Sequence, residues 1–117
     1  MTKISIIMPV YNDANRLNKS ITSIINQSLD NIELICVNDG SQDNSLEILN
    51  DFADKYDFIK VLSQENQGSG KARNYGMSEA TGDYIGFLDI SVTNDEIDVS
   101  ELYEKFAVDL KEYLLNK

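Results

Sequence analysis

The run ISIIMPV at residues 4–10 decides the fold of this chain, together with the run IELICV at residues 32–37. Both runs are rich in β-branched residues, and most of their positions are apolar. Apolar runs that are nearly continuous are typical of strands buried on both faces, as they are in a parallel sheet. We therefore expect two buried strands of a parallel sheet at these positions.

Helical and strand patterns alternate along the chain as far as residue 88. Apolar residues recur at helical spacing after each of the two runs: Leu17, Ile21, Ile24 and Ile25, and then Leu46, Leu49, Phe52, Ala53 and Tyr56. Asn12 or Asp13 is the expected cap of the first helix. Further strands are predicted at residues 59–63 and 84–88, with a helix over residues 70–80 between them. The order β-α-β-α-β-α-β predicts an α/β fold with a parallel sheet and right-handed crossovers.

The chain beyond residue 90 has a different pattern. Residues 91–98 are polar and predict a loop, and Ser100 is the expected cap of an amphipathic helix that follows. The apolar positions of this helix are Leu102, Phe106, Leu110, Tyr113 and Leu114. We therefore divide the chain into an α/β unit at residues 1–92 and a loop with a C-terminal helix at residues 93–117.

The composition fits one small soluble domain. The chain has 117 residues, of which 20 are acidic and 10 basic, so the net charge is -10. This balance argues against nucleic acid and against an anionic membrane surface as partners. The longest apolar run is too short to cross a bilayer, and the N-terminus lacks the pattern of a signal peptide. The single cysteine, Cys36, lies inside an apolar run and is expected to be buried, so we predict a cytoplasmic protein.

Polar side chains follow three of the predicted strands at their carboxyl ends. They are the groups Tyr11-Asn12-Asp13 and Asn38-Asp39-Gly40-Ser41, and the single residue Asp89. Ligands of open parallel sheets bind outside the carboxyl ends of the strands. Each group alone also fits an ordinary turn or helix cap. Three such groups at one edge of the sheet favour a binding site.

The segment NQGSGKARNYG at residues 66–76 is a second candidate. Gly68 and Gly70 allow the backbone to approach a ligand closely, and a helix N-terminus with Lys71 and Arg73 could meet a diphosphate. A plain loop is the alternative interpretation. The segment is neither a P-loop nor a dinucleotide fingerprint, because these need glycine at positions 65 and 73 respectively.

Four segments, taken in order, resemble glycosyltransferase family 2. They are PVYN at residues 9–12, NDGSQD at 38–43, the glycine-rich segment at 66–76, and ATGDYIGFLD at 80–89. The likeness covers roughly residues 3 to 89 and keeps the order and spacing of the family. It implies the GT-A fold, a Rossmann-like three-layer α/β/α arrangement with a mostly parallel sheet. It also implies inverting transfer of a sugar from a nucleoside-diphosphate donor, usually with Mg²⁺ or Mn²⁺.

The resemblance also implies a set of donor-binding residues. They are Pro9, Val10, Tyr11, Asn12, Asp39, Gly68, Gly70, Arg73 and Asp89. The first four would border the nucleobase and ribose, and Asp39 would accept a hydrogen bond from the base, which favours the imide of a UDP-sugar. Arg73 and the glycine loop would lie near the ribose and the diphosphate. Asp89 matches the first acid of the Asp-x-Asp metal motif.

The sequence departs from the family pattern in two respects. Ser91 stands where the second acid of the metal motif is expected, and a neutral hydroxyl is a poor Mg²⁺ ligand. Metal binding is therefore expected to be weak or lost. The acceptor half of the family, with its catalytic base, normally lies well beyond residue 89, so we assign no catalytic residue.

Three hypotheses follow. The favoured one is a glycosyltransferase fragment of cell-surface glycan synthesis that binds the donor and is inactive alone. The second is a degenerate, non-catalytic module that binds a nucleotide or a partner. The third is a phospho-acceptor receiver or a redox domain. The chain lacks the paired acids after the first strand and the fifth strand with its lysine that a receiver needs, and it lacks the glycine pattern of a redox domain. The C-terminal helix and the missing half favour a homodimer.

Overall fold

The structure is a computed structural model, and it describes residues 3–26, 31–88 and 90. The strands are β1 (Ile4–Val10), β2 (Ile32–Asp39), β3 (Ile59–Gln64) and β4 (Tyr84–Phe87), and the helices are α1 (Ala14–Ile25), α2 (Ser45–Lys55) and α3 (Ser69–Glu79). The predicted order of strands and helices is confirmed. Asp89, Ser91, the predicted C-terminal helix and the division at residues 92 and 93 lie outside the described residues.

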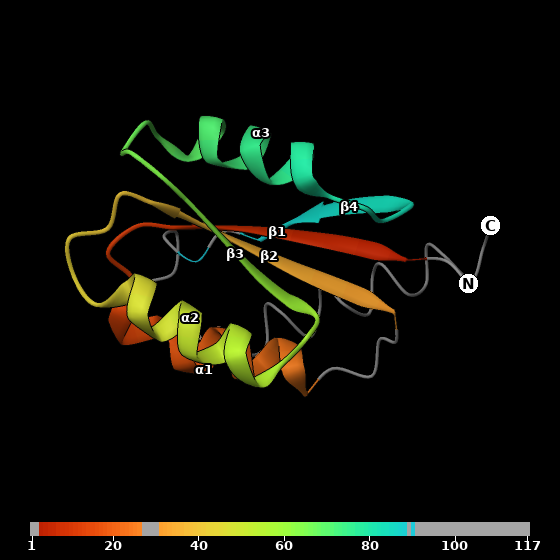
Figure 1. Cartoon of the computed structure of the whole chain (residues 1–117), viewed down its shortest axis with the longest axis horizontal. Helices are drawn as coiled ribbons and strands as arrows, with labels where there is room; N and C mark the ends of the chain where they lie inside the picture. Colours follow the sequence, from red (N-terminus) through yellow and green to blue (C-terminus); the bar gives the residue numbers. More distant parts are fainter. Residues whose placement is uncertain (1–2, 27–30, 89, 91–117) are drawn as a thin grey trace.

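The four strands form one parallel sheet in the order β3-β2-β1-β4. Because all four strands are parallel, their carboxyl ends lie at the same edge of the sheet. Helices α1 and α2 cover one face and α3 covers the other, so the molecule has three layers (Figure 1). The predicted three-layer α/β/α class is confirmed.

The core between the sheet and α1 and α2 is built from alternate residues of the strands. Its buried members are Ile4, Ile6, Met8, Val10, Leu17, Ile21, Ile24, Leu34, Cys36, Leu49, Ile59, Leu88 and Ile90. Cys36 is buried as predicted, and burial raises the pKa of its thiol to about 12. This cysteine is therefore protonated and unreactive at neutral pH.

Helix α3 packs closely on the opposite face of the sheet. Ile7, Ile35 and Val37 form a second buried cluster there with Ala72 of α3. Gly76 allows the close approach, because a Cβ at this position would lie 2.5 Å from Cγ2 of Ile7. The glycine therefore brings the helix, and the loop that precedes it, close to the sheet.

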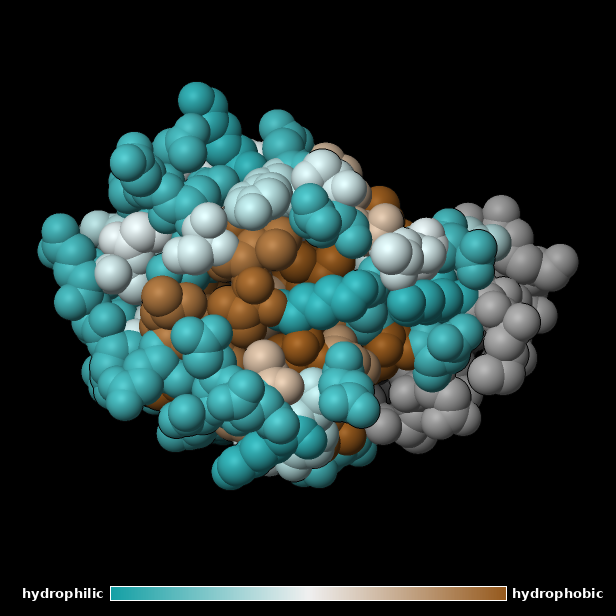
Figure 2. Space-filling model, viewed as in Figure 1, coloured by the Kyte–Doolittle hydropathy of each residue, from teal (hydrophilic) through white to brown (hydrophobic). Residues whose placement is uncertain are grey.

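Strand β3 forms one edge of the sheet and faces the viewer in Figure 1. Figure 2 shows apolar surface in the middle of this view, surrounded by hydrophilic side chains. Val61 and Leu62 of β3 are partly buried, whereas Lys60 is exposed. A lysine on an edge strand disfavours pairing with a strand of another chain.

A buried carboxylate, Glu33, joins the amino ends of the strands. Its Oε2 accepts hydrogen bonds from the Ser5 hydroxyl (2.5 Å), the Thr81 N–H (2.7 Å) and the Thr81 hydroxyl (3.0 Å), and its Oε1 accepts one from Lys60 Nζ (2.7 Å). Burial by itself would raise the pKa of Glu33, but these hydrogen bonds outweigh it and lower the pKa to about 2. The charged side chain thus connects the turn before β4 to β1, β2 and β3.

Candidate functional site

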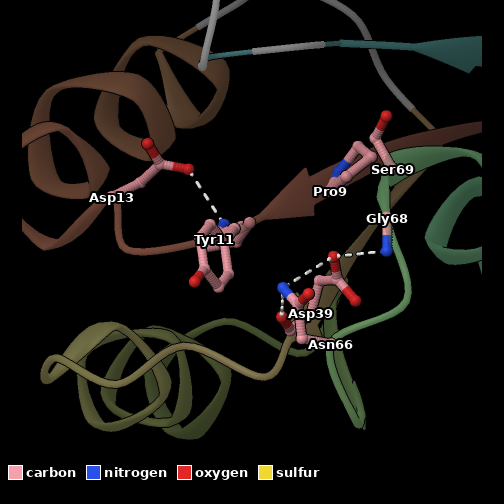
Figure 3. Close-up of a pocket in the computed structure, with 8 residues that line it drawn as sticks. Pro9, Tyr11, Asp13, Asp39, Asn66, Gly68 and Ser69 are labelled. Carbon is pink, nitrogen blue, oxygen red and sulfur yellow. Dashed lines mark hydrogen bonds between the residues drawn. The ribbon is translucent and has the colours of Figure 1, made fainter.

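A pocket of about 260 Å³ opens at the carboxyl ends of β1 and β2 (Figure 3). Eight residues line it: Pro9, Val10, Tyr11, Asp13, Asp39, Asn66, Gly68 and Ser69. Five of them belong to the predicted donor-binding set. The other three are Asp13, which belongs to the polar group after the first strand, and Asn66 and Ser69, which belong to the glycine-rich segment 66–76. Each lies within two residues of a predicted one, and this proximity is the signal that could have identified them.

The first wall of the pocket is the exposed ring of Tyr11, which follows β1. The N–H of Tyr11 donates a hydrogen bond to Oδ2 of Asp13 (3.1 Å). Asp13 is buried, its own N–H donates to Oγ of Ser45 (3.0 Å), and its Oδ1 lies 3.5 Å from Nη1 of Arg16. Asp13 occupies the predicted N-cap position of α1 but makes no side-chain cap bond to that helix. Its carboxylate instead fixes the backbone that carries Tyr11.

Asn12 joins two loops rather than lining the pocket. It has a φ of +51°, a left-handed conformation that asparagine tolerates better than most residues. Its N–H donates to Oγ of Ser41 (3.0 Å), and its Oδ1 accepts from the N–H of Gln42 (2.7 Å). The N–H of Ala14 donates to Oδ2 of Asp43 (3.2 Å), which adds a third bond between the same loops. The loop after β1 is therefore held against the loop after β2.

Asp39 lies at the end of β2 and organises the opposite wall of the pocket. Its Oδ1 accepts hydrogen bonds from Nε2 of Gln64 (2.9 Å) and the N–H of Gln67 (2.8 Å). Its Oδ2 accepts one from the N–H of Gly68 (3.0 Å) and has a longer contact of 3.5 Å with Nδ2 of Asn66. Burial would raise the pKa of Asp39, but the hydrogen bonds from Gln64, Gln67 and Gly68 outweigh it and hold the pKa below its usual range. Asp39 is therefore charged at neutral pH.

Gly68 adopts a backbone conformation at this wall that favours glycine. Its φ is +98°, a conformation that L side chains rarely adopt, and this geometry turns its N–H toward Asp39. Ser69 then begins α3, so the pocket adjoins the N-terminus of a helix of 11 residues. The N–H groups and the dipole of such a terminus favour an anionic group.

The remaining predicted residues lie elsewhere or outside the described chain. Gly70 and Arg73 are on α3 and are not among the residues that line the pocket; Gly70 is exposed and Arg73 is half-buried. Asp89, the predicted metal ligand, is outside the described residues. Within residues 3–26, 31–88 and 90, no three acidic or cysteine side chains are grouped in a way that could hold a metal ion. The roles of Arg73 and Asp89 therefore stay predictions.

The chemistry of the pocket suits binding better than acid–base catalysis. A general base works best when its pKa lies near the operating pH, whereas the hydrogen bonds to Asp39 lower its pKa. Pro9, Val10 and the Tyr11 ring offer a mostly apolar surface, and Asp39 offers an acceptor beside it. An apolar surface with a few fixed polar groups is typical of a small-molecule site.

Comparison with known proteins decides the family. The model of Glycosyl transferase family 2 matches residues 5–113. The chain belongs to this family. An uncharacterized glycosyltransferase of Haemophilus influenzae is 50% identical over 101 residues, which cover 84% of this chain and 40% of that protein. The cholesterol galactosyltransferase of Borreliella burgdorferi is 38% identical over 107 residues, which cover 92% of this chain and 30% of that protein. The chain thus spans less than half the length of either relative.

Solved structures of glycosyltransferases share the fold. Residues 1–349 of TarS from S. aureus, in complex with UDP-GlcNAc, match with a TM-score of 0.69 and 31% identity, over 74% of this chain and 26% of TarS 1-349. A mannosyltransferase of Pyrobaculum calidifontis, in complex with GDP-Man and Mn²⁺, matches with a TM-score of 0.73 over 91% of this chain and 32% of its own. Its identity of 20% supports the fold alone. The predicted family and GT-A fold are confirmed.

In the part of the chain that the structure describes, no helix combines the length and the apolar character that crossing a bilayer requires.

Proposed function

We propose that this chain is the donor-binding part of a family 2 glycosyltransferase, and that its pocket holds the base and ribose of a nucleoside-diphosphate sugar. The observation that carries the proposal is the charged Asp39 at the pocket, beside the exposed ring of Tyr11 and the backbone of Gly68. The ring of Tyr11 can stack on a planar base. The start of α3 is suited to the negative charge of a diphosphate. TarS, which shares 31% identity, binds UDP and UDP-GlcNAc, and this likeness supports the same class of ligand here.

The hydrogen bonds of Asp39 favour a base with an imide N–H, which is uracil or thymine. A carboxylate has about four acceptor positions. Two acceptor positions on Oδ1 accept short hydrogen bonds from Gln64 and Gln67, and one position on Oδ2 accepts a short hydrogen bond from Gly68. The second position on Oδ2 is used only by the longer contact of 3.5 Å from Nδ2 of Asn66, so a single donor, such as the imide N–H of uracil or thymine, could take it. Cytosine has no hydrogen on the equivalent ring nitrogen, and guanine presents two adjacent donors, so both fit this acceptor less well.

Calorimetric titration with UDP, dTDP, CDP and GDP tests the proposal. We expect UDP or dTDP to bind most tightly, and we expect Asp39→Asn to weaken that binding by about tenfold or more, because a hydrogen bond to a charged group is lost. Asp57→Asn, an exposed acid in the turn after α2, is the matched control and should bind as the wild type does. Failure of all four nucleotides to bind would refute the proposed donor site.

We also propose that sugar transfer in cell-surface glycan synthesis, on the cytoplasmic side, belongs to the whole protein and not to these 117 residues alone. The relatives above are more than twice as long as the part that this chain matches, and we assign no general base among the described residues. Release of UDP from a UDP-sugar by the purified chain would contradict this view.

The alternative, a degenerate binding module, is favoured by Ser91 at the second position of the metal motif. Metal binding is expected to be weak or lost under both hypotheses, so only one outcome of a UDP titration with and without Mn²⁺ separates them. Clearly tighter binding of UDP in the presence of Mn²⁺ would contradict the degenerate module, because the ion would then neutralise diphosphate charge at a working metal position. Equal affinity in both conditions is expected under either hypothesis.

A further inference from the structure

Asp13 lies at the N-cap position of α1 but turns its carboxylate away from that helix. An acidic N-cap side chain normally accepts a hydrogen bond from an N–H in the first turn of the helix. Asp13 makes no such bond to α1. Its Oδ2 instead accepts the N–H of Tyr11, two residues earlier in the chain (Figure 3). Helix capping therefore does not explain why this carboxylate is buried beside the pocket.

The two carboxylates that line the pocket, Asp13 and Asp39, differ in what they offer to a ligand. Asp39 keeps a position on Oδ2 that only a long contact of 3.5 Å occupies. The side chain of Asp13 is only 3% exposed, its Oδ2 is used by Tyr11, and its Oδ1 faces Arg16. Oxygens that protein donors already use are poor acceptors for a ligand. Asp13 can therefore act on a bound nucleotide through Tyr11 and not by direct contact.

The ring of Tyr11 depends on its backbone for its position. The residue is 46% exposed, so few neighbouring atoms pack against the ring. A side chain that becomes ordered only when a ligand binds lowers the affinity. The bond from Asp13 fixes the N–H of Tyr11, next to the Cα from which the ring extends. Asp13 is held in turn, because its own N–H donates to Oγ of Ser45, the fully buried first residue of α2.

We propose that Asp13 is a positioning residue for the donor base. Its carboxylate holds the backbone of Tyr11 so that the ring is in place to stack on the base before the nucleotide arrives. This inference rests on the proposed function, because it requires a base beside Tyr11. Arg16 balances the charge of the buried carboxylate. Asp13 thus raises the affinity for the nucleotide without touching it, since less order has to be imposed on binding.

Calorimetric titration with UDP or dTDP, whichever binds the wild type more tightly, tests the proposal. Asp13→Ala should weaken binding by about tenfold, whereas Asp13→Asn should retain most of it, because an amide oxygen can still accept the N–H of Tyr11. In a Tyr11→Ala background, Asp13→Ala should have no further effect, because no ring remains to be positioned. Glu33→Gln is the matched control. It neutralises another buried carboxylate, at the amino ends of the strands, and should bind the nucleotide as the wild type does.

Hydrogen exchange of the Tyr11 amide in the nucleotide-free protein, followed by NMR, tests the hydrogen bond by itself. We expect this amide to be protected in the wild type and in Asp13→Asn, and to lose protection by about tenfold in Asp13→Ala while the amides of β1 and β2 stay protected. The wild type and Asp13→Asn keep the proposal testable even if Asp13→Ala does not fold. An unprotected Tyr11 amide in the wild type would overturn the proposal and leave the donor site intact.

Two results of the titration would also overturn the proposal. One is an equal loss of affinity for Asp13→Ala with and without the ring of Tyr11, because the effect would then not pass through Tyr11. The other is a loss in Glu33→Gln as large as that in Asp13→Ala, because reduced stability would then account for both. A wild type that binds no nucleotide although its Tyr11 amide is protected would instead refute the donor site, and the positioning role would fall with it.

Discussion

Two buried serines, Ser45 and Ser20, differ in whether their hydroxyl groups have a partner. Both are fully buried, but Oγ of Ser45 accepts the N–H of Asp13, whereas Oγ of Ser20 has no hydrogen-bond partner in the described structure. We expect Ser45→Ala to lower the free energy of unfolding by about 1 kcal/mol, because a buried N–H loses its acceptor. We expect Ser20→Ala to leave it unchanged or raise it, since no bond is lost and alanine is the better helix former. Urea denaturation measures both, and a larger loss for Ser20→Ala would contradict the assignment.

The lowered pKa of Glu33 leads to a second prediction about a single residue. Its pKa is lowered from 4.5 to about 2, so its contribution to stability is fully present above about pH 4.5 and is lost as the pH falls toward 2. We expect Glu33→Gln to lower the free energy of unfolding at pH 7 by about 1 to 3 kcal/mol, because Lys60, Ser5 and Thr81 lose a charged partner. The difference between variant and wild type should shrink between pH 4.5 and 2. The exposed Glu47→Gln serves as control, and a difference that stays constant over this range would contradict the prediction.

At the scale of the element, the packing of α3 on the sheet predicts opposite effects for two glycines of one helix. Replacing a helical glycine with alanine normally stabilises a protein by about 0.5 to 1 kcal/mol. Gly70→Ala should follow this rule, because a Cβ there meets no atom within 4 Å. Gly76→Ala should instead cost about 1 to 3 kcal/mol, because its Cβ would lie 2.5 Å from Cγ2 of Ile7. Thermal unfolding of both variants checks the contrast, and a stabilised Gly76→Ala would refute the close contact.

The elements were predictable from the sequence to within one or two residues at most of their ends. The reason is that the runs at residues 4–10 and 32–37 are buried on both faces, which leaves a continuous apolar signal. The hydrogen bonds of Glu33 could not be predicted from these runs, because its partners in space, Lys60 and Thr81, are distant in sequence. A carboxylate inside an apolar run could have been marked as paired, but its partners depend on strand order.

The candidate site was predictable only in part, for a similar reason. Parallel strands bring their carboxyl ends together, so the sequence placed Tyr11 and Asp39 at one edge. It could not show that Asp39 already accepts bonds from Gln64, Gln67 and Gly68, since these bonds depend on the path of a loop. Nor could it place Arg73 relative to the pocket, because that depends on how α3 is rotated on the sheet.

For the whole molecule, the net charge of -10 predicts how stability responds to salt. Excess charge of one sign destabilises the compact state through self-repulsion, and salt screens exposed charges most strongly. We expect the free energy of unfolding in urea to rise by about 0.5 to 1 kcal/mol when NaCl increases from about 10 mM to about 200 mM. Salt also weakens attractive pairs, but its effect on the pair of Glu33 and Lys60 is small, because the carboxylate of this pair is buried and is screened little. A variant that neutralises the exposed acids Glu47 and Asp54 of α2 should respond less to salt. A fall in stability with added NaCl would mean that attractive charge pairs outweigh the repulsion.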